Sequence, residues 1–420
     1  MDFKENLLEY LDKNFVEELI EAMQKERTNC LVLNTKKMSC ENFENLFPNV
    51  RKNAMIQNAY FYDKNDYDFG KSFYFDNGLF YIMDSASMMV SFLLPVFEGE
   101  NVLDMCAAPG GKTIFLALKN RGINLISNDV NYNRSLVLSS NIEKIGLENV
   151  IVCSNTINSL KNNYKTTFDK IILDAPCSGS AMFRKNDDIK NDWNYNKVLK
   201  CTTDQEALLE QASTMLEDGG IISYSTCSFS YEEDENIIIN FLEKHENFKP
   251  IYIPDNETFY RGKNLPESIH LFPNLFDGEG QFICQLKKDG ILLPKKDEKN
   301  KNKLNKYGFK YLEKIEDRIY VTNNVLNLKY LSIIRRGLHV ATLKGDNIIP
   351  SFHYSHYLSA ENSIVLNEDE LKKYLHGDEI LKATKLKTGY YPVSYKNINL
   401  GFVHVVGNKL KNLYPKGLRH

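Results

Sequence analysis

The sequence predicts an α/β fold built on a doubly wound parallel sheet, and three observations support this prediction. Short apolar runs alternate with helical patterns across residues 84–286, as consecutive βα units require. A glycine-rich turn, Asp104–Thr113, follows one of these runs. Two other runs lead into cysteine segments, Asp174–Ser180 and Tyr224–Phe229. Because parallel strands of such a sheet end at one edge, we expect these three segments to lie together.

The strands and helices of this sheet follow from the same pattern. A capping-box motif at Thr203 and Glu206 predicts a helix running to about Leu216, and Glu217–Gly220 should end it. A further helix is expected at Glu232–Glu243, and the sheet should end before Lys287. The predicted strands are Asn101–Met105, Asn124–Asn128, Val150–Cys153, Phe168–Leu173 and Gly220–Tyr224.

The flanking regions have a different character. Asn6–Met23 has the apolar spacing of one amphipathic helix, and Asn29–Asn34 is typical of a strand. Tyr60–Tyr81 alternates aromatic residues, and similar β-like alternation occurs at Ile319–Leu328 and Gly389–Val406. We therefore divide the chain into an N-terminal domain (1–83), the α/β domain (84–286), a basic linker (287–306) and a C-terminal region (307–420).

The bulk composition narrows the class of protein. The 420 residues are too many for one ordinary core. No apolar run is long enough to cross a membrane, and the polar start of the chain predicts no signal peptide, so we expect a cytoplasmic protein without a membrane partner. The eight cysteines include no Cys-x-x-Cys pair and no zinc-like spacing with histidine, so we expect free thiols and no metal. The net charge of −3 does not by itself indicate a nucleic-acid partner.

Several motifs in a fixed order resemble a known family. Besides the glycine turn and the two cysteine segments, they are Asp84–Met88, Phe183–Lys185 and Gly278–Phe282. This ordered set resembles the Nol/Nop/Sun family of RNA 5-methylcytosine methyltransferases, and within it the bacterial RsmF-type branch that methylates ribosomal RNA. The resemblance implies a Rossmann-like methyltransferase sheet with an N-terminal extension domain and a C-terminal PUA-like RNA-binding domain. The last stretch, Leu386–His420, resembles the end of that RNA-binding domain more weakly.

The resemblance implies S-adenosyl-L-methionine as cofactor. Gly110 and Gly111 would let the backbone approach a ligand, and the helix N-terminus that follows suits a carboxylate. Asp129, 25 residues beyond Asp104, is placed to accept from a ribose. Asn155 stands where the family has an acid that contacts adenine, so that contact should be altered. On its own the glycine turn also fits an ordinary βα connection. The expected cofactor residues are Cys106, Ala107, Ala108, Pro109, Gly110, Gly111, Lys112, Asp129, Asn155 and Asp174.

The two cysteines suit covalent catalysis on a pyrimidine. Carbon 5 of cytosine becomes nucleophilic only after a thiolate adds to carbon 6, and an acid near N3 assists that addition. By resemblance, Cys227 is the nucleophile, Cys177 serves as a base in product release, and Asp174 holds the N3 edge. Lys112 would orient the base or help to activate the nucleophile. A lone cysteine at a strand end is usually inert packing, and Cys106, Cys153 and Cys201 keep that interpretation.

Two basic segments are candidates for RNA contact. Arg184 and Lys185 could meet phosphates, while Phe183 could stack on a base or pack on its own loop. The C-terminal stretch combines basic residues with Tyr414, as phosphate contact and base stacking require. A solvated turn and a soluble tail are the competing interpretations. The expected RNA-binding residues are Arg184, Lys185, Lys409, Lys411, Lys416 and Arg419.

The sequence therefore predicts an enzyme that methylates cytosine carbon 5 in RNA, with small-subunit ribosomal RNA as the first candidate and tRNA as the alternative. A DNA cytosine-5 methyltransferase would use Cys177 as nucleophile and leave Thr226-Cys227 unexplained. An amino-group methyltransferase would need a Pro-Pro-aromatic motif in place of Ala175-Pro176-Cys177. A non-catalytic RNA-binding or ribosome-assembly factor could keep the fold, but the intact cysteines, Asp174 and Lys112 disfavour it.

Overall fold

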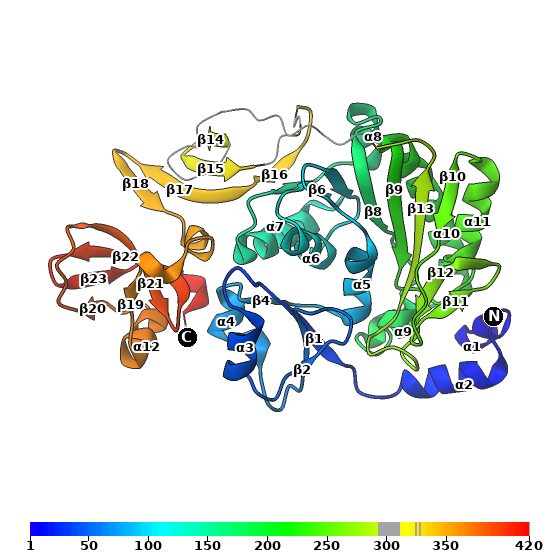
Figure 1. The fold of residues 1–420 in the computed structure, drawn as a ribbon, viewed down its shortest axis with the longest axis horizontal. Coiled ribbons are helices and arrows are strands. Elements are labelled where there is room, and N and C mark those ends of the chain that lie inside the picture. The colour runs from blue at the N-terminus through cyan, green and yellow to red at the C-terminus, as the bar shows by residue number, and fades with distance from the viewer. Residues whose placement is uncertain (293–310, 324–325, 327–328, 420) are drawn as a thin grey trace.

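The computed structural model describes residues 1–292, 311–323, 326 and 329–419. A large sheet flanked by helices occupies the middle of the chain, with the N-terminal sheet below it and the C-terminal sheets on the opposite side from the N-terminal helices (Figure 1). Most of the predicted basic linker (287–306) falls within residues 293–310, which lie outside the described residues.

The central sheet confirms the predicted doubly wound fold. Its five parallel strands lie in the order β7 (Val150–Cys153), β6 (Asn124–Asn128), β5 (Asn101–Asp104), β8 (Phe168–Asp174), β9 (Leu216–Thr226). The strand order reverses beside β5, so the carboxyl ends of β5, β8 and β9 form a crevice for a ligand. On the β9 side the sheet continues antiparallel through β13 (Gln281–Lys288), β12 (Leu265–Leu271) and β11 (Tyr260–Gly262), and β10 (Phe248–Ile251) also pairs with β13.

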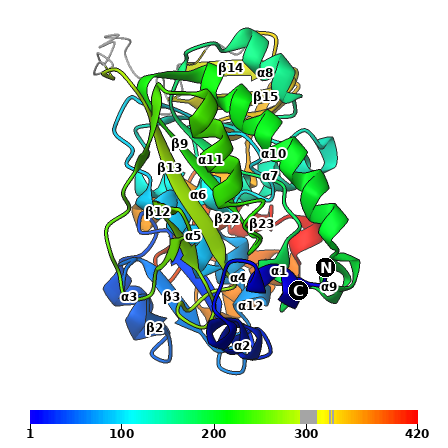
Figure 2. The same cartoon turned by 90° about the vertical axis from the view of Figure 1, so that its right-hand side faces the viewer.

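Helices cover both faces of this sheet (Figures 1 and 2). One face carries α5 (Ser85–Leu93), α6 (Gly111–Lys119) and α7 (Tyr132–Ile145), and the other carries α8 (Ile157–Asn163), α10 (Tyr195–Met215) and α11 (Glu235–Lys244). The short α9 (Asp187–Asp192) precedes α10. Because both faces are covered, the parallel strands are almost entirely buried, and the four residues of β7 are all buried and apolar.

Three local predictions in this domain are wrong. Helix α10 begins after its N-cap Asn194, so Thr203 and Glu206 lie inside the helix and form no capping box. The residues Glu217–Gly220 belong to strand β9, because Leu216 already pairs with Phe168 of β8. The sheet also does not end before Lys287, since β13 runs to Lys288 and a later strand joins the far edge.

The N-terminal residues form two separate units. The helix predicted at Asn6–Met23 is two helices, α1 (Phe3–Leu8) and α2 (Lys13–Ala22). The chain turns between them, and the Tyr10 hydroxyl donates to the backbone oxygen of Phe229, so this pair packs on the catalytic domain. A four-stranded sheet follows, in the order β2 (Arg51–Lys52), β3 (Ala59–Tyr62), β1 (Asn29–Leu33), β4 (Phe80–Ile82), with α3 (Cys40–Leu46) and α4 (Phe73–Asp76).

The C-terminal residues form two small sheets and one strand of the central sheet. The first sheet has the order β14 (Tyr311–Ile315), β15 (Arg318–Thr322), β17 (Leu338–Lys344), β18 (Asn347–Pro350). Strand β16 (Ile333–Arg336) lies between β15 and β17 in the chain, but it pairs antiparallel with β7 of the central sheet. The second sheet has the order β19 (Ile364–Val365), β21 (Gly389–Tyr395), β22 (Ile398–Val406), β23 (Lys409–Asn412), β20 (Ile380–Leu381), with α12 (Glu368–His376). Short 3₁₀ turns occur at Phe69–Lys71, Ser180–Met182, Phe352–His356, Ala360–Asn362 and Lys416–Leu418.

Candidate active site

The cysteine segments meet because their strands are neighbours. Strands β8 and β9 run parallel, with Asp174 opposite Ser225. The chain beyond each strand turns into the same crevice, and the sulfur atoms of Cys177 and Cys227 lie 3.0 Å apart. Both cysteines are partly exposed and free, so a ligand in the crevice could reach them.

Asp174 connects these cysteines to the glycine turn. Its Oδ2 accepts a hydrogen bond from Lys112 Nζ at 2.8 Å. Its Oδ1 accepts from Ser225 Oγ at 2.7 Å and from Gln281 Nε2 at 2.9 Å. The Lys112 ammonium also donates to Ser87 Oγ at 2.8 Å. Four segments of the chain thus fix the orientation of one carboxylate and one ammonium.

The electrostatics of the site distinguish its groups. Burial pulls the pKa of Lys112 down, but the Asp174 carboxylate outweighs burial and the pKa is raised, so this side chain is a permanent cation. The hydrogen bond to Cys227, together with burial, raises the pKa of Cys177 well above its ordinary value. Cys177 is therefore a thiol at neutral pH, and its S–H can be donated to the Cys227 sulfur.

A buried carboxylate that the sequence did not identify holds the two cysteine loops together. Glu233 Oε1 accepts from the Ser178 backbone N–H at 2.8 Å and from Gln205 Nε2 at 3.0 Å. Its Oε2 accepts from Ser228 Oγ at 2.6 Å and Ser178 Oγ at 2.5 Å. Ser178 and Ser228 each follow one of the cysteines, so Glu233 fixes the spacing of the sulfurs. It lies in an acidic run that looks solvent-exposed in sequence.

The glycine turn has the backbone geometry expected of a ligand cradle. Gly110 has φ +113°, and a Cβ there would lie 2.8 Å from Leu138 Cδ1, so only glycine fits. Helix α7 holds the carbonyls of the turn, because Arg134 Nη2 donates to Ala108 O at 2.7 Å and Asn141 Nδ2 to Pro109 O at 2.9 Å. Sequence reasoning missed both residues, whose side chains reach across from another helix.

Asp129 directly follows β6, the parallel strand beside β5, and is buried. Its Oδ1 accepts from the Asn131 backbone N–H at 3.0 Å, and the Arg134 guanidinium lies 3.4 Å from Oδ2. Oδ2 is buried and has no hydrogen-bond partner among the described residues. A buried acceptor without a donor is costly, and the hydroxyls of a ribose would satisfy it. The residues around the turn therefore fit S-adenosylmethionine.

Comparisons with known proteins agree with this geometry. The family model described as 16S rRNA methyltransferase RsmB/F matches residues 91–287, and the model described as Methyltransferase RsmF PUA domain matches residues 361–420. The chain belongs to the RsmB/F methyltransferase family. It is thus an S-adenosylmethionine-dependent RNA methyltransferase with a C-terminal PUA domain.

Relatives of this RsmB/F protein cover nearly all of its length or about half of it. Ribosomal RNA small subunit methyltransferase F of Shewanella piezotolerans is 27% identical over 96% of this chain and 93% of its own. The protein of the same name from Aliivibrio fischeri is 37% identical over 52% of this chain and 47% of its own. A methyltransferase homologue from Pyrococcus horikoshii has a similar structure, with a TM-score of 0.57, 28% identity, and coverage of 68% of this chain and 93% of that one.

Asn155, which the family resemblance places at the adenine, is buried and its amide is hydrogen-bonded within the chain. Its side-chain oxygen accepts from the Ser332 backbone N–H at 3.0 Å, and its Nδ2 donates to Ser332 O at 3.4 Å. The amide therefore anchors the segment that leads into β16. An aspartate at this position would lose the donor to Ser332 O.

The basic residues after the cysteine loop differ in exposure. The Arg184 guanidinium is buried, with Nε 3.0 Å from Glu279 Oε2 and Nη2 donating to Gly278 O at 2.5 Å. This pairing does not support its expected phosphate contact. Phe183 is buried and packs against the Phe3 ring, which excludes base stacking here. Lys185 is exposed and remains a candidate for RNA contact.

The C-terminal tail is ordered, but its residues have different environments. Tyr414 is 1% exposed and packs in the core of the PUA domain, so the expected stacking surface is wrong. Lys409 pairs with Glu379 at 2.9 Å. The Arg419 side chain folds back to donate to Tyr414 O at 3.1 Å. Lys411 and Lys416 are exposed and have no ion-pair partner among the described residues.

Two other expectations concern absences. In the described part of the chain, no helix is long and apolar enough to cross a membrane. Asp234, Glu235 and His270 are fully buried, and one ligand atom from each lies within 4.8 Å of the others. That geometry could hold a metal ion, so the expected absence of a metal stays a prediction.

Proposed function

We propose that this enzyme methylates carbon 5 of a cytosine in small-subunit ribosomal RNA through a covalent adduct with Cys227. The observation that carries this proposal is the pair of sulfurs 3.0 Å apart beside the Lys112–Asp174 pair. The relatives named ribosomal RNA small subunit methyltransferase F support the RNA class. Such a substrate would place the enzyme in the cytoplasm, as the sequence predicts.

The chain's own residues would hold the cofactor and define where the base is placed. S-adenosylmethionine, when bound, supplies an electrophilic methyl group. Asp129 would accept a hydrogen bond from the ribose of the cofactor. The turn at Gly110 would leave room for its methionine end, and the free N–H groups at the start of α6 would face its carboxylate. Cys106 through Lys112 would line this cradle, with Asp174 between the cofactor and the base.

Addition of the nucleophile would begin the reaction. The Cys227 thiolate forms a bond to carbon 6, and the electrons of the carbon 5–carbon 6 double bond move so that carbon 5 can attack the methyl group. The Cys177 S–H and the Lys112 cation stabilise the thiolate before it attacks. Asp174, held by three donors, would lie at the N3 edge, and once it has taken up a proton it would donate to N3 the hydrogen bond that favours addition.

Release would then need two events at the same place. The proton on carbon 5 must be removed, and the bond between carbon 6 and the Cys227 sulfur must break. Cys177 is the group beside that sulfur, and its raised pKa makes its thiolate a strong but sparsely populated base. This arrangement suits Cys227 as nucleophile, because the Cys177 thiol can donate its S–H to the Cys227 sulfur and stabilise it as a thiolate.

Bisulfite sequencing of total RNA from cells with and without the gene tests the proposal. We expect one small-subunit ribosomal cytosine to lose its methyl group in the deletion strain and regain it with the wild-type gene. Loss of a methyl group on tRNA instead would replace the substrate but keep the chemistry. Unchanged methylation everywhere would favour a non-catalytic assembly factor.

A further inference from the structure

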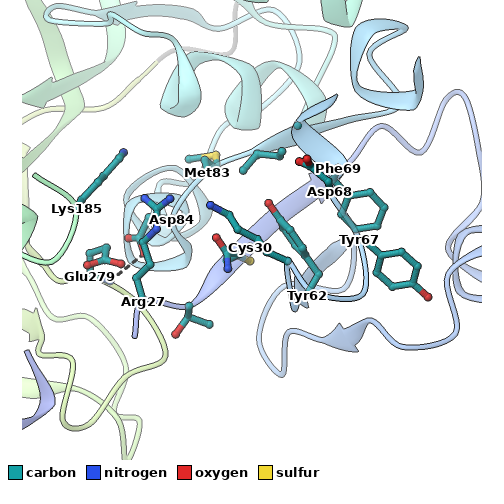
Figure 3. A pocket seen from close by; sticks show the side chains of 15 residues that line it. Arg27, Cys30, Tyr62, Tyr67, Asp68, Phe69, Met83, Asp84, Lys185 and Glu279 are labelled. Atoms are coloured by element: carbon teal, nitrogen blue, oxygen red, sulfur yellow. Dashed lines mark hydrogen bonds between the residues drawn. The ribbon is translucent and has the colours of Figure 1, made fainter. Parts of the chain in front are cut away.

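A cavity of about 260 Å³ lies between the N-terminal sheet and the catalytic domain (Figure 3). One wall is aromatic and consists of Tyr62, at the end of strand β3, and of Tyr67 and Phe69, which follow it. The opposite side consists of Arg27, from the segment before β1, and catalytic-domain residues that include Lys185 and Glu279. Figure 3 shows Asp84 between these two sides, near Met83. The site described above contains none of these walls.

Most charged groups of this cavity are divided by depth. The exception is Asp68, an exposed carboxylate of the lining that pairs with Lys71 at 3.1 Å. Arg27, Lys64 and Lys185 are exposed, and none has an ion-pair partner in the parts of the chain that the structure describes. The carboxyl groups of Asp84 and Glu279 are less exposed, and burial raises the pKa of each. Glu279 is already paired with Arg184 at 3.0 Å. A phosphate would therefore be favoured at the rim and disfavoured inside.

A short chain of hydrogen bonds joins the cavity to the catalytic residues. Asp84 Oδ2 accepts from the Ser87 backbone N–H at 3.0 Å, and Ser87 Oγ accepts from Lys112 Nζ at 2.8 Å. Lys112 in turn holds Asp174 at 2.8 Å. On the other side, Asp84 Oδ1 accepts from the Glu279 backbone N–H at 2.9 Å, and Gln281, two residues on, donates to Asp174. The cavity therefore borders the place of the target base.

We propose that this cavity binds one unpaired nucleotide of the RNA strand next to the target cytosine. The base lies against Tyr67, the half-buried member of the aromatic wall, since Tyr62 and Phe69 are buried. Arg27, Lys64 and Lys185 contact the flanking phosphates. This inference rests on the proposed function, because the target base must leave its helix before Cys227 can reach it, and its neighbours are then unstacked. Aromatic faces accept any such base, and base edges carry N–H donors that suit the deeper carboxyl groups.

Neutralising the rim is the first test. The triple variant Arg27→Ser, Lys64→Ser, Lys185→Ser should weaken binding of a fluorescein-labelled oligouridine by tenfold or more. It should also lower the slope of log affinity against log salt by up to about 2, at about 0.7 per lost phosphate contact in single strands. With hypomethylated small-subunit ribosomal RNA as substrate, KM should rise while kcat and cofactor affinity stay unchanged.

A matched control changes the same charge elsewhere. Lys165, Lys244 and Lys287 are exposed and have no ion-pair partner among the described residues. They lie near the amino ends of the parallel strands, away from the crevice. The variant Lys165→Ser, Lys244→Ser, Lys287→Ser should bind the oligouridine like wild type. If both triple variants lost the same oligouridine affinity, the loss would come from the change in net charge alone, and the proposal would be overturned.

The aromatic wall is tested separately. Tyr67→Leu should weaken oligouridine binding about tenfold through lost stacking, with far-UV spectra checked for folding. Because Tyr67 also packs against Phe69, photocrosslinking of 4-thiouridine RNA to the wild-type enzyme gives an independent readout. Crosslinks within residues 60–70 support the proposal, and crosslinks confined to other segments overturn it. Binding and crosslinking need no turnover, so failure of the cavity and failure of the proposed methylation are distinguishable.

Discussion

The cysteine loops and the C-terminal tail both carry conspicuous motifs, yet they differ in how the fold uses them. The cysteines follow neighbouring strands, and their sulfurs lie 3.0 Å apart as the strand order requires. The tail's basic and aromatic residues have no such constraint. Tyr414 is buried in the PUA core and Lys409 pairs with Glu379. Sheet topology thus determines which strand ends meet, whereas distant partners decide which surface residues stay free.

Removing the charge at the centre of the cysteine site should have the largest effect after loss of the nucleophile. Asp174→Asn should lower kcat about 10³-fold, because it removes the anion that holds Lys112 and faces the base. Single-turnover methylation at saturating cofactor measures this. The control Asp277→Asn changes an exposed carboxylate and should be near wild type. Equal rates for the two variants would remove Asp174 from catalysis.

The cofactor side of the same crevice should show a smaller effect. Asp129→Ala should weaken S-adenosylmethionine binding by 10- to 100-fold, or about 1.5–3 kcal/mol, because a charged hydrogen bond is lost. Isothermal calorimetry on the folded variant gives the affinity directly. An unchanged affinity would mean that the unpartnered Oδ2 of Asp129 does not face the ribose.

The pH dependence of release tests the role of Cys177. Its pKa is raised by the hydrogen bond to Cys227 and by burial, so its thiolate fraction is small at neutral pH and grows as pH rises. Release of methylated RNA should therefore accelerate by up to about tenfold per pH unit from neutral pH upward. Cys177→Ala should show a flat profile. A wild-type release rate that falls with pH would contradict a base role.

Substitutions in the C-terminal tail should have the smallest effect on RNA binding, and the four basic residues should contribute unequally. We expect a smaller salt slope of RNA binding when serine replaces Lys409, Lys411, Lys416 and Arg419. The decrease should be smaller than the loss of four phosphate contacts would give, because Lys409 is already paired with Glu379. Lys411→Ser with Lys416→Ser should account for most of the change. If Lys409→Ser alone matched that pair, exposure would not be the deciding property. Equal slopes for wild type and the quadruple variant would leave the tail without phosphate contacts.

Sequence reasoning recovered the parts of the molecule that local pattern determines. Four of the five predicted strands of the central sheet agree closely with β5 to β8, because buried parallel strands are continuous apolar runs. It missed Glu233, Arg134 and Asn141, whose roles depend on contacts across the fold. It did not predict β16, since a strand that adds to the edge of a distant sheet has no local signature. The hydrogen bonds of Asn155 were missed for the same reason, as its partner Ser332 is remote in sequence.

The most direct test of the account is covalent trapping with the two cysteine variants. Cys227→Ala should form no adduct with 5-fluorocytosine RNA and should not methylate normal RNA. Cys177→Ala should accumulate a denaturant-stable adduct on normal RNA, because addition and methylation proceed while release stalls. Gel electrophoresis of both reactions decides the assignment. Adduct formation by Cys227→Ala together with its absence in Cys177→Ala would contradict the account and make Cys177 the nucleophile.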